Sequence, residues 1–377
     1  MRAGRRTRAL ILAVSAALSV SLLSGGAGAP AQAEETGKFG SVIGQTVRPD
    51  GWRGLNNGRA IYYWTQNSDG RPVKASGALF LPDGPAPADG WPVVAYDHGT
   101  SGYGTGCGGQ SFADAQENRY ITRLVRSGYA VIAPDYVGLG PYDTGVHPYL
   151  DGRSESAATI DLFTAARSLE PTLSRTWAVT GDSQGGQAAL VTAHRQQTYG
   201  PKTDFRGVVA IDPESDVEKV MPLLGPYVPP VPPLGGSYGF LGAILAGLRD
   251  ADPSARVNSY LTPAGRKFVD SIDDQCRPEW DEGMAFGSLL SRPLGQGPLP
   301  AALHRYMAVP VSGYDAPILL VLNTLDLTVP SPLHAKLAAD LTLNGVPYRA
   351  AVAGGEHTDL DAAQWAAFDG FFARVLE

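Results

Sequence analysis

The sequence contains few cysteines: only Cys107 and Cys276 occur among its 377 residues. Neither belongs to a CxxC pair and no HExxH is present, so the usual spacings of a zinc or redox site are missing. We therefore expect no metal ion and no organic cofactor. In an exported protein an even pair of cysteines fits one disulfide, with two free buried thiols as the alternative.

Basic residues are also scarce. The chain has 30 Lys and Arg against 37 Asp and Glu, and four of the arginines lie before residue 34: Arg2, Arg5, Arg6 and Arg8. The remaining chain is therefore acidic and has no basic run, and an acidic surface repels phosphate backbones. This composition excludes nucleic acid as a partner, and nothing in the sequence implies a protein partner.

Long apolar runs are missing after residue 33. Before it, residues 9–23 form an uncharged, mostly apolar run that follows the four arginines, and Ala31, Gln32 and Ala33 give a small-x-small pattern before Glu34. This layout is typical of a secretory signal peptide over residues 1–33, cleaved near Ala33. A membrane anchor is the alternative, but a spanning helix needs about 20 apolar residues. We expect a secreted, extracellular protein.

Short apolar runs alternate with helical patterns along most of the chain. Strands are expected at 60–65, 73–81, 92–96, 129–133, 177–180, 208–211, 318–323 and 348–353, and helices near 112–127 and at 156–169, 184–197 and 361–376. The first two strands form a hairpin or meander. Apolar strands of four to six residues separated by helices are typical of a parallel sheet buried on both faces. The sequence predicts an α/β fold with a mostly parallel, doubly wound sheet.

The alternation fails at residues 213–315, which we call the insertion. It would divide the core into residues 34–212 and 316–377. Its stretch from Met221 to Leu248 carries no charge and is rich in Pro and Gly, so regular helices are not expected there. So long a structureless loop is unusual in a compact domain, and a cap or lid subdomain is expected above the carboxyl ends of the strands, where open α/β sheets bind ligands. Its apolar residues would face substrate or, alternatively, pack a small core of their own.

One strand–turn–helix segment carries the strongest chemical signal. Residues 177–186 read WAVTGDSQGG, which places the pattern G-x-S-x-G between an expected strand and an alanine-rich helix. Gly181 and Gly185 suit a turn so sharp that larger side chains would collide with neighbouring backbone. Such a turn lifts the Ser183 hydroxyl clear of the sheet, at the positive end of the helix. We predict that Ser183 is a nucleophile rather than part of an ordinary Gly/Ser turn.

A serine hydroxyl needs a base, and the base needs an orienting carboxylate. His357 follows the last expected strand and Asp326 follows the strand before it. The chain order Ser, acid, His is that of an α/β-hydrolase, so we predict Asp326 as the acid and His357 as the base. Asp359 and Glu356 are the alternative acids. His334 is expected in a surface helix and is set aside.

Acyl transfer also needs preorganised donors for the oxyanion. The main-chain amide of Gln184, directly after the nucleophile, is one candidate. The other is expected in the loop 98–102 (HGTSG) after the strand at 92–96, and we choose Thr100. A flexible glycine loop without a catalytic role is the alternative.

Several motifs together resemble the secretory lipase family of α/β-hydrolases, which includes lipases of the yeast lipase A type. They are HGTSG at 98–102 followed by Cys107, DYVGLG at 135–140, HPYL at 147–150, GDSQGG at 181–186, the Asp326 turn and the His357 loop. The likeness extends from about Tyr62 to the C-terminus. It implies hydrolysis of acylglycerols or simpler carboxylic esters, a helical cap in the insertion, a triad of Ser183, Asp326 and His357, and oxyanion donors at Thr100 and Gln184.

The expected function is therefore a secreted serine hydrolase that cleaves small-molecule or lipid esters through an acyl-enzyme, with transient contact to a lipid interface. A peptidase or amidase on the same fold is the first alternative, and a catalytically silent binding protein is the second. The choice between lipase and short-chain esterase stays open. We expect Asp135 to anchor a loop, and His147 to be structural.

Overall fold

The computed structural model describes residues 37–200, 202–229, 238–273, 276 and 285–377. The expected signal peptide at 1–33 lies outside these residues. None of the described helices is both long enough and apolar enough to cross a membrane.

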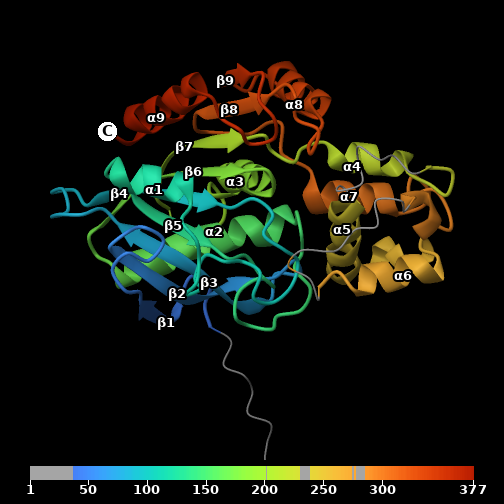
Figure 1. Cartoon of the computed structure of the whole chain (residues 1–377), viewed down its shortest axis with the longest axis horizontal. Coiled ribbons are helices and arrows are strands. Elements are labelled where there is room, and N and C mark those ends of the chain that lie inside the picture. Colours follow the sequence, from blue (N-terminus) through green and yellow to red (C-terminus); the bar gives the residue numbers. More distant parts are fainter. Residues whose placement is uncertain (1–36, 201, 230–237, 274–275, 277–284) are drawn as a thin grey trace, which may run out of the picture. The chain divides into compact units, whose positions relative to one another are not determined.

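Nine strands of the described chain form one sheet in the order β1-β2-β3-β5-β4-β6-β7-β8-β9 (Figure 1). They are β1 (Val42–Val47), β2 (Asn57–Gln66), β3 (Pro72–Leu81), β4 (Trp91–Asp97), β5 (Ala130–Pro134), β6 (Leu173–Asp182), β7 (Asp204–Ile211), β8 (Ile318–Asn323) and β9 (Tyr348–Ala353). The first three strands pair antiparallel, as do β3 and β5, and every pair from β5 to β9 along the sheet is parallel. The prediction of a mostly parallel sheet is confirmed.

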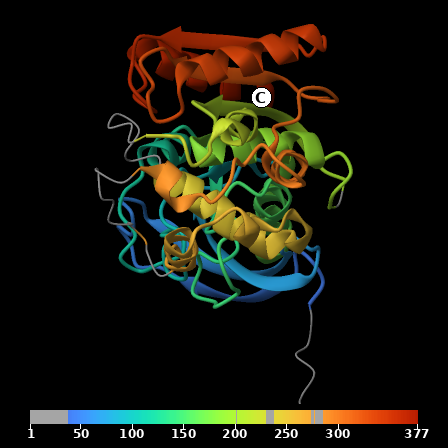
Figure 2. The same ribbon diagram turned by 90° about the vertical axis from the view of Figure 1, so that its right-hand side faces the viewer.

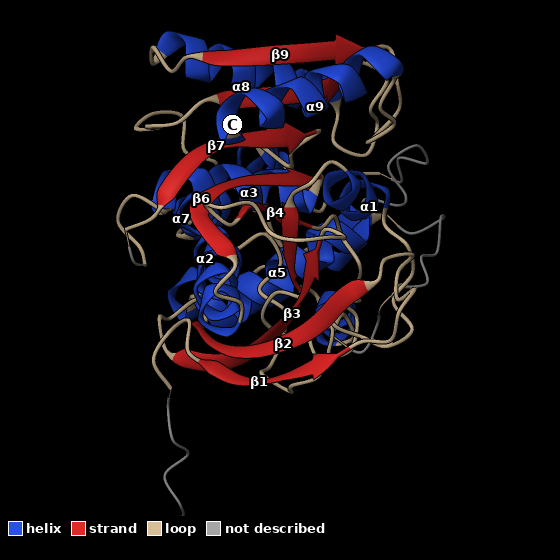
Figure 3. Ribbon diagram, turned by 90° about the vertical axis from the view of Figure 1, so that its left-hand side faces the viewer, coloured by secondary structure: helices blue, strands red, loops and turns tan. Residues whose placement is uncertain are grey.

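Helices cover both faces of this sheet (Figure 3). They are α1 (Arg119–Arg126) and α9 (Ala362–Leu376) on one face, and α2 (Gly152–Leu169), α3 (Gln184–Arg195) and α8 (Ser331–Leu343) on the other. Successive side chains of a strand point to opposite faces, so Val93 of β4 belongs to the same apolar cluster as Phe163 of α2, whereas Val94 belongs to the cluster that contains Phe368 of α9. An apolar strand thus supplies both cores, and the sheet is doubly wound as predicted.

The insertion, which lies between β7 and β8 in the sequence, folds as a helical layer at one side of the sheet (Figures 1 and 2). Its described elements are α4 (Val217–Val220), η1 (Met221–Leu223), α5 (Tyr238–Ala251), η3 (Pro253–Ala255), η4 (Val257–Ser259), α6 (Pro263–Asp270), η5 (Phe286–Leu289) and α7 (Leu299–Met307). A third apolar cluster joins Ile244 of α5 and Leu303 of α7 to Tyr149 from the core. The insertion therefore has its own core, which is the alternative interpretation of its apolar residues.

Three expectations about local structure were wrong. Regular helix was not expected before Leu248, but α5 begins at Tyr238 because its apolar residues are buried in the insertion's core. The first helix begins only at Arg119, where the Asn118 side chain caps it by accepting from the amides of Tyr120 and Ile121. Strand β1 was not expected; it is mostly exposed and pairs only with β2, so it lacks the apolar pattern of a buried strand.

One disulfide joins Cys107, in the loop after β4, to Cys276, in the segment after α6. The two residues are 169 positions apart. This confirms the disulfide and not the free thiols. The bond attaches the insertion to the loop region that follows β4.

Candidate active site

Four predicted site residues lie after neighbouring parallel strands at one edge of the sheet: Thr100 after β4, Ser183 after β6, Asp326 after β8 and His357 after β9. The carboxyl ends of parallel strands meet at that edge. A cleft of about 390 Å³ opens there, and it is lined by Tyr96, His98, Gly99, Thr100, Ser101, Gln110, Asn118, Asp182, Ser183, Phe240, Thr328, His357 and Thr358. We call it the polar cleft. It brings three of the four residues together, and Asp326 lies behind His357.

Ser183 occupies a strained turn between β6 and α3. Its φ of 57° lies in the left-handed region, and its amide donates to the carbonyl of Ile211 on β7. A Cβ atom on Gly181 would lie 2.1 Å from the Gly185 carbonyl oxygen, and one on Gly185 would lie 1.9 Å from the Asp97 carbonyl oxygen. The turn therefore requires glycine at both positions, which is the reason that the sequence pattern suggested.

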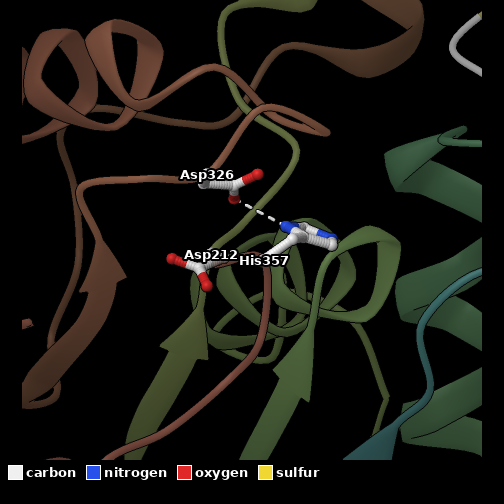
Figure 4. A group of neighbouring side chains, drawn as sticks. All are labelled: Asp212, Asp326 and His357. Carbon is white, nitrogen blue, oxygen red and sulfur yellow. Dashed lines mark hydrogen bonds and ion pairs between the residues drawn. The ribbon is translucent and has the colours of Figure 1, made fainter. Parts of the chain in front are cut away.

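The predicted acid and the predicted base, Asp326 and His357, are in direct contact (Figure 4). His357 Nδ1 donates to Asp326 Oδ2 over 2.6 Å. The other carboxylate oxygen of Asp326 accepts from the amides of Thr328 and Val329, at 2.9 and 3.0 Å. Burial alone would raise the pKa of Asp326, but the hydrogen bonds from His334 and His357 hold it well below its ordinary value. Asp326 therefore stays ionised and fixes the tautomer of His357. Glu356 and Asp359, the alternative acids, are exposed.

Carboxylates also tune the base. Burial lowers the pKa of His357, but the hydrogen bond that His357 donates to Asp326 and the charges of Asp326, Asp212 and Glu214 raise it above the ordinary value of a histidine. The imidazolium form is thereby stabilised, which suits a group that must hold a proton during catalysis.

The hydroxyl of Ser183 is turned towards a residue that the sequence did not suggest. Among the described residues, its side-chain hydrogen bond runs to Glu214 Oε1, at 3.5 Å, and not to His357. Ser183 and His357 nevertheless face the same polar cleft. Catalytic hydrogen bonds are often long or misaligned before substrate binds, so this geometry is compatible with a serine–histidine pair.

The expected oxyanion donors lie on either side of Ser183. Gln184 begins α3, where an amide has no partner within the helix. Its side chain is buried away from the cleft and donates to Glu155 Oε1 (2.7 Å) and His147 Nε2 (2.9 Å). Thr100 lines the cleft, and its hydroxyl is 2.7 Å from that of Tyr149. The main-chain amides of both residues therefore remain the predicted oxyanion donors.

His334 is not on the surface, and this expectation was wrong. It lies on α8 but is only 2% exposed, because α8 packs its side chain against the carboxylates at the strand ends. His334 Nε2 donates to Asp326 Oδ2 over 3.1 Å and lies 3.7 Å from Asp212 Oδ1. Two histidines therefore share one oxygen of the candidate acid. The signal in the sequence was that His334 follows Asp326 by eight residues, and helix α8 places its side chain beside Asp326.

We predict that His334 positions Asp326. His334→Leu should lower kcat about tenfold with little change in KM, because Asp326 loses one of the donors that fix its orientation. His334→Gln keeps an N–H at a similar reach and should retain most of the activity. Steady-state kinetics on a p-nitrophenyl ester, with thermal unfolding of both variants, checks this. Equal losses in the two variants would show that the donor is irrelevant.

Asp212, Asp326 and His357 form the acidic cluster shown in Figure 4, with potential ligand atoms within 4.8 Å of one another. Protein hydrogen bonds account for this close approach. Asp212 accepts from the amide and side chain of Asn323, both at 2.7 Å, and from the amide of Thr358 at 2.8 Å. Asp212 thus ties together the segments that carry Asp326 and His357.

A second, apolar cavity of about 150 Å³ adjoins the polar cleft and shares Phe240 and Thr328 with it. Its walls come from the insertion and from the start of α8, with Glu214 among them: Glu214, Val217, Val220, Met221, Leu224, Phe240, Leu241, Ile244, Thr328, Val329, Pro330 and Leu333. We call it the apolar cavity. The described part of the charge-free stretch therefore faces both the insertion's core and this cavity.

Two motif residues have supporting roles. Asp135 Oδ1 accepts from the amide of Gln110 (2.6 Å), and its Oδ2 accepts from the hydroxyl of Ser76 (2.7 Å), so it anchors the loop after β4 as expected. His147 is fully buried, and burial lowers its pKa to about 3. It donates from Nδ1 to the Val137 carbonyl and supports the Gln184 side chain.

Comparison with known proteins agrees with this geometry. Residues 110–285, which include Ser183, match the family model described as secretory lipase. The comparison with curated protein sequences gave no match.

Several solved structures share the fold. Candida antarctica lipase A in its closed state aligns with a TM-score of 0.72 and 18% identity, over 90% of this chain and 84% of that chain. The rice cell wall degrading esterase LipA of Xanthomonas oryzae, in a ligand-bound form, aligns with a TM-score of 0.68 and 19% identity, over 89% of this chain and 95% of that chain. A putative hydrolase of Legionella pneumophila aligns with a TM-score of 0.63 and 17% identity, over 85% of this chain and 87% of that chain. The resemblance to the secretory lipases is thereby confirmed, and this chain is a carboxylic ester hydrolase with the α/β-hydrolase fold.

Proposed function

We propose that the protein is a secreted serine esterase in which Ser183, His357 and Asp326 form the catalytic triad. The observation that carries this proposal is the 2.6 Å contact from His357 Nδ1 to Asp326 Oδ2, made beside a serine on a strained turn in the same cleft. Secretion is supported by the signal-peptide pattern at 1–33, by the disulfide and by the match to a secretory family.

The triad chemistry follows from these positions. Ser183 Oγ attacks the ester carbonyl carbon, and its proton passes to His357 Nε2. The amides of Thr100 and Gln184 stabilise the oxyanion that forms on the carbonyl oxygen. His357 returns the proton to the leaving alcohol as the acyl-enzyme forms. Water then attacks the acyl-enzyme, again with His357 as base, and releases the acid and Ser183.

The apolar cavity is the proposed site for the acyl chain. It adjoins the polar cleft, and its lining is almost entirely aliphatic or aromatic. An engineered apolar cavity of 150 Å³ in another protein holds benzene, so a cavity of this size takes a chain of about six carbons. This favours a short- to medium-chain esterase over an enzyme for long acyl chains.

We therefore predict that kcat/KM on p-nitrophenyl esters is highest at about four to six acyl carbons, because longer chains exceed the cavity. Leu241→Trp would fill part of the cavity and should move this optimum to shorter chains. Leu343→Trp is the matched control, since Leu343 is 83% exposed and does not line the cavity. An optimum at ten or more carbons, or the same profile in both tryptophan variants, would contradict the cavity as the acyl site.

Contact with a lipid interface is proposed at the mouth of the apolar cavity. Val220, Leu224 and Thr328 line the cavity, and three exposed apolar or aromatic side chains lie within three residues of one of them in the sequence: Leu223, Tyr227 and Leu327. Exposed apolar groups that surround a binding cavity are typical of interaction surfaces.

A further inference from the structure

We propose that Glu214 is a second catalytic carboxylate of this site, which acts on the Ser183–His357 pair in addition to Asp326. This inference rests on the proposed triad. Its starting observation is that the hydroxyl of Ser183 donates to Glu214 Oε1, at 3.5 Å, in the free enzyme. Glu214 therefore contacts the reacting atom itself.

The main chain holds Glu214 firmly beside the nucleophile. Its amide donates to the carbonyl oxygen of Ser183 over 3.1 Å. Two residues earlier, Asp212 is fixed to Asn323 and Thr358 by the hydrogen bonds described above. Asp212 and Asp216 both adopt left-handed backbone conformations, with φ of 39° and 61°. Such conformations are costly for residues other than glycine and persist where the surroundings determine them.

The surroundings of the carboxyl group favour its ionised form once His357 takes up a proton. Glu214 is only 4% exposed. The hydroxyl of Tyr149 donates to its Oε1 over 2.6 Å and lies 2.7 Å from the hydroxyl of Thr100. Burial, and to a lesser extent the charge of Asp326, keep the pKa of Glu214 above its ordinary value, although the Tyr149 hydrogen bond, the charge of His357 and the Ser183 hydrogen bond each lower it. Ionisation of Glu214 and protonation of His357 therefore favour each other.

The other charged and titratable groups near this pair come from several elements. His357 faces Asp326, Asp212 and Glu214, and its charge also acts on Asp182 at the end of β6. Glu214 faces Tyr149, Tyr103, His357 and Asp326. His334 of α8 contacts Asp326 and Asp212. Among these groups, Glu214 is the carboxyl that contacts Ser183 Oγ, so its charge acts where the proton leaves the hydroxyl.

The chemical role follows without any further reactant. As Ser183 Oγ forms its bond to the carbonyl carbon, the hydroxyl proton moves to His357 Nε2 and the carbonyl electron pair moves onto oxygen. The hydrogen bond from Ser183 to Glu214 is lost in this step. The Glu214 carboxylate then faces the imidazolium and stabilises it, in addition to Asp326 on the Nδ1 side.

The test is Glu214→Gln in the full-length secreted enzyme. Glutamine keeps an oxygen that accepts from Tyr149 and Ser183 but carries no charge. Less negative charge beside His357 lowers the pKa of its imidazolium, so the acid limb of kcat/KM should move to lower pH by about half a unit or more. We expect kcat to fall about tenfold, with little change in KM for p-nitrophenyl acetate. Where turnover is too slow to measure, the pH dependence of the rate of labelling by a fluorophosphonate reports the same acid limb.

Glu218→Gln is the matched control. Glu218 is a buried glutamate on α4, four residues further on, and its ion-pair contact with a histidine is to His304 at 4.0 Å. This variant should keep the acid limb of the parent enzyme. An unmoved limb and an unchanged kcat in Glu214→Gln would overturn the proposal, as would equal shifts in the two variants.

A second variant covers the case in which Glu214→Gln does not fold. Tyr149→Phe removes a donor to the carboxylate, so the pKa of Glu214 should rise and the acid limb should move the same way by a smaller amount. An unmoved limb in Tyr149→Phe would then overturn the role of Glu214. The proposed function has a separate test: it is wrong if ester turnover persists without the Ser183 hydroxyl. If turnover depends on Ser183 but does not change in Glu214→Gln, only the inference about Glu214 is wrong.

Discussion

Replacing Ser183 with alanine should reduce kcat/KM on p-nitrophenyl butyrate by roughly 10⁵-fold or more, which is the scale found when a triad nucleophile is removed. The fold should persist, because the loss of one oxygen changes little in the packing and alanine meets the same backbone strain as serine at a φ of 57°. The change therefore separates chemistry from folding. Labelling by a fluorophosphonate probe should disappear together with turnover.

Ser168→Ala is the matched control for this experiment. Ser168 lies on α2, and among the residues that the structure describes its hydroxyl donates only to the Ala165 carbonyl, so its loss should leave both turnover and labelling unchanged. Thermal unfolding of both variants should overlap with that of the parent enzyme. Substantial turnover by a folded Ser183→Ala protein would rule out the acyl-enzyme and leave a different mechanism to be found.

Removing the disulfide should lower the free energy of unfolding by about 3–5 kcal/mol, because the cross-link closes a long loop in the unfolded chain. The bond spans 169 residues and attaches the insertion to the loop after β4. The double variant Cys107→Ser/Cys276→Ser leaves no thiol in the chain, so mispairing cannot obscure the result. Urea unfolding of the two proteins measures the difference.

A reductant provides an independent comparison. Dithiothreitol should bring the parent enzyme to the stability of the double variant and should not change the double variant itself. If the urea midpoints of the oxidised parent and the double variant coincide, the cross-link contributes nothing and the packing around Gly102, Cys107 and Cys276 holds these segments without it.

The sequence predicted the parts of this enzyme that local rules determine. The apolar strands, the glycine-bounded turn at Ser183 and the order of acid and base follow from spacing along the chain, and the structure has the strands and the turn where they were expected. The helix before β5 was expected from about residue 112 but begins at Arg119, after a loop in which the amides of residues 110 and 111 donate to Asp135. That contact joins two distant segments, so no local pattern indicates it.

The residues that the sequence did not suggest are those whose role depends on tertiary contacts. His334 was expected in a surface helix. The first turn of α8 has few charged residues, so the sequence does not indicate which face of this helix is buried. Glu214 lies at the start of the insertion, between β7 and α4, and belongs to no motif. Its proximity to Ser183 follows from the pairing of β6 with β7, which brings the two strand ends together.

The hydrogen bonds of Asp212 have a consequence for how this scaffold could diversify. They join Asp212, the first residue after β7, to Asn323 at the end of β8 and to Thr358 in the His357 loop. These contacts form a brace that holds the two loops together before the chain enters the helical layer. From Val217 onward, changes in length or sequence can reshape the apolar cavity without disturbing that brace. A graft that exchanges the helical layer for one from a relative should therefore be joined beyond this point, with the brace left intact.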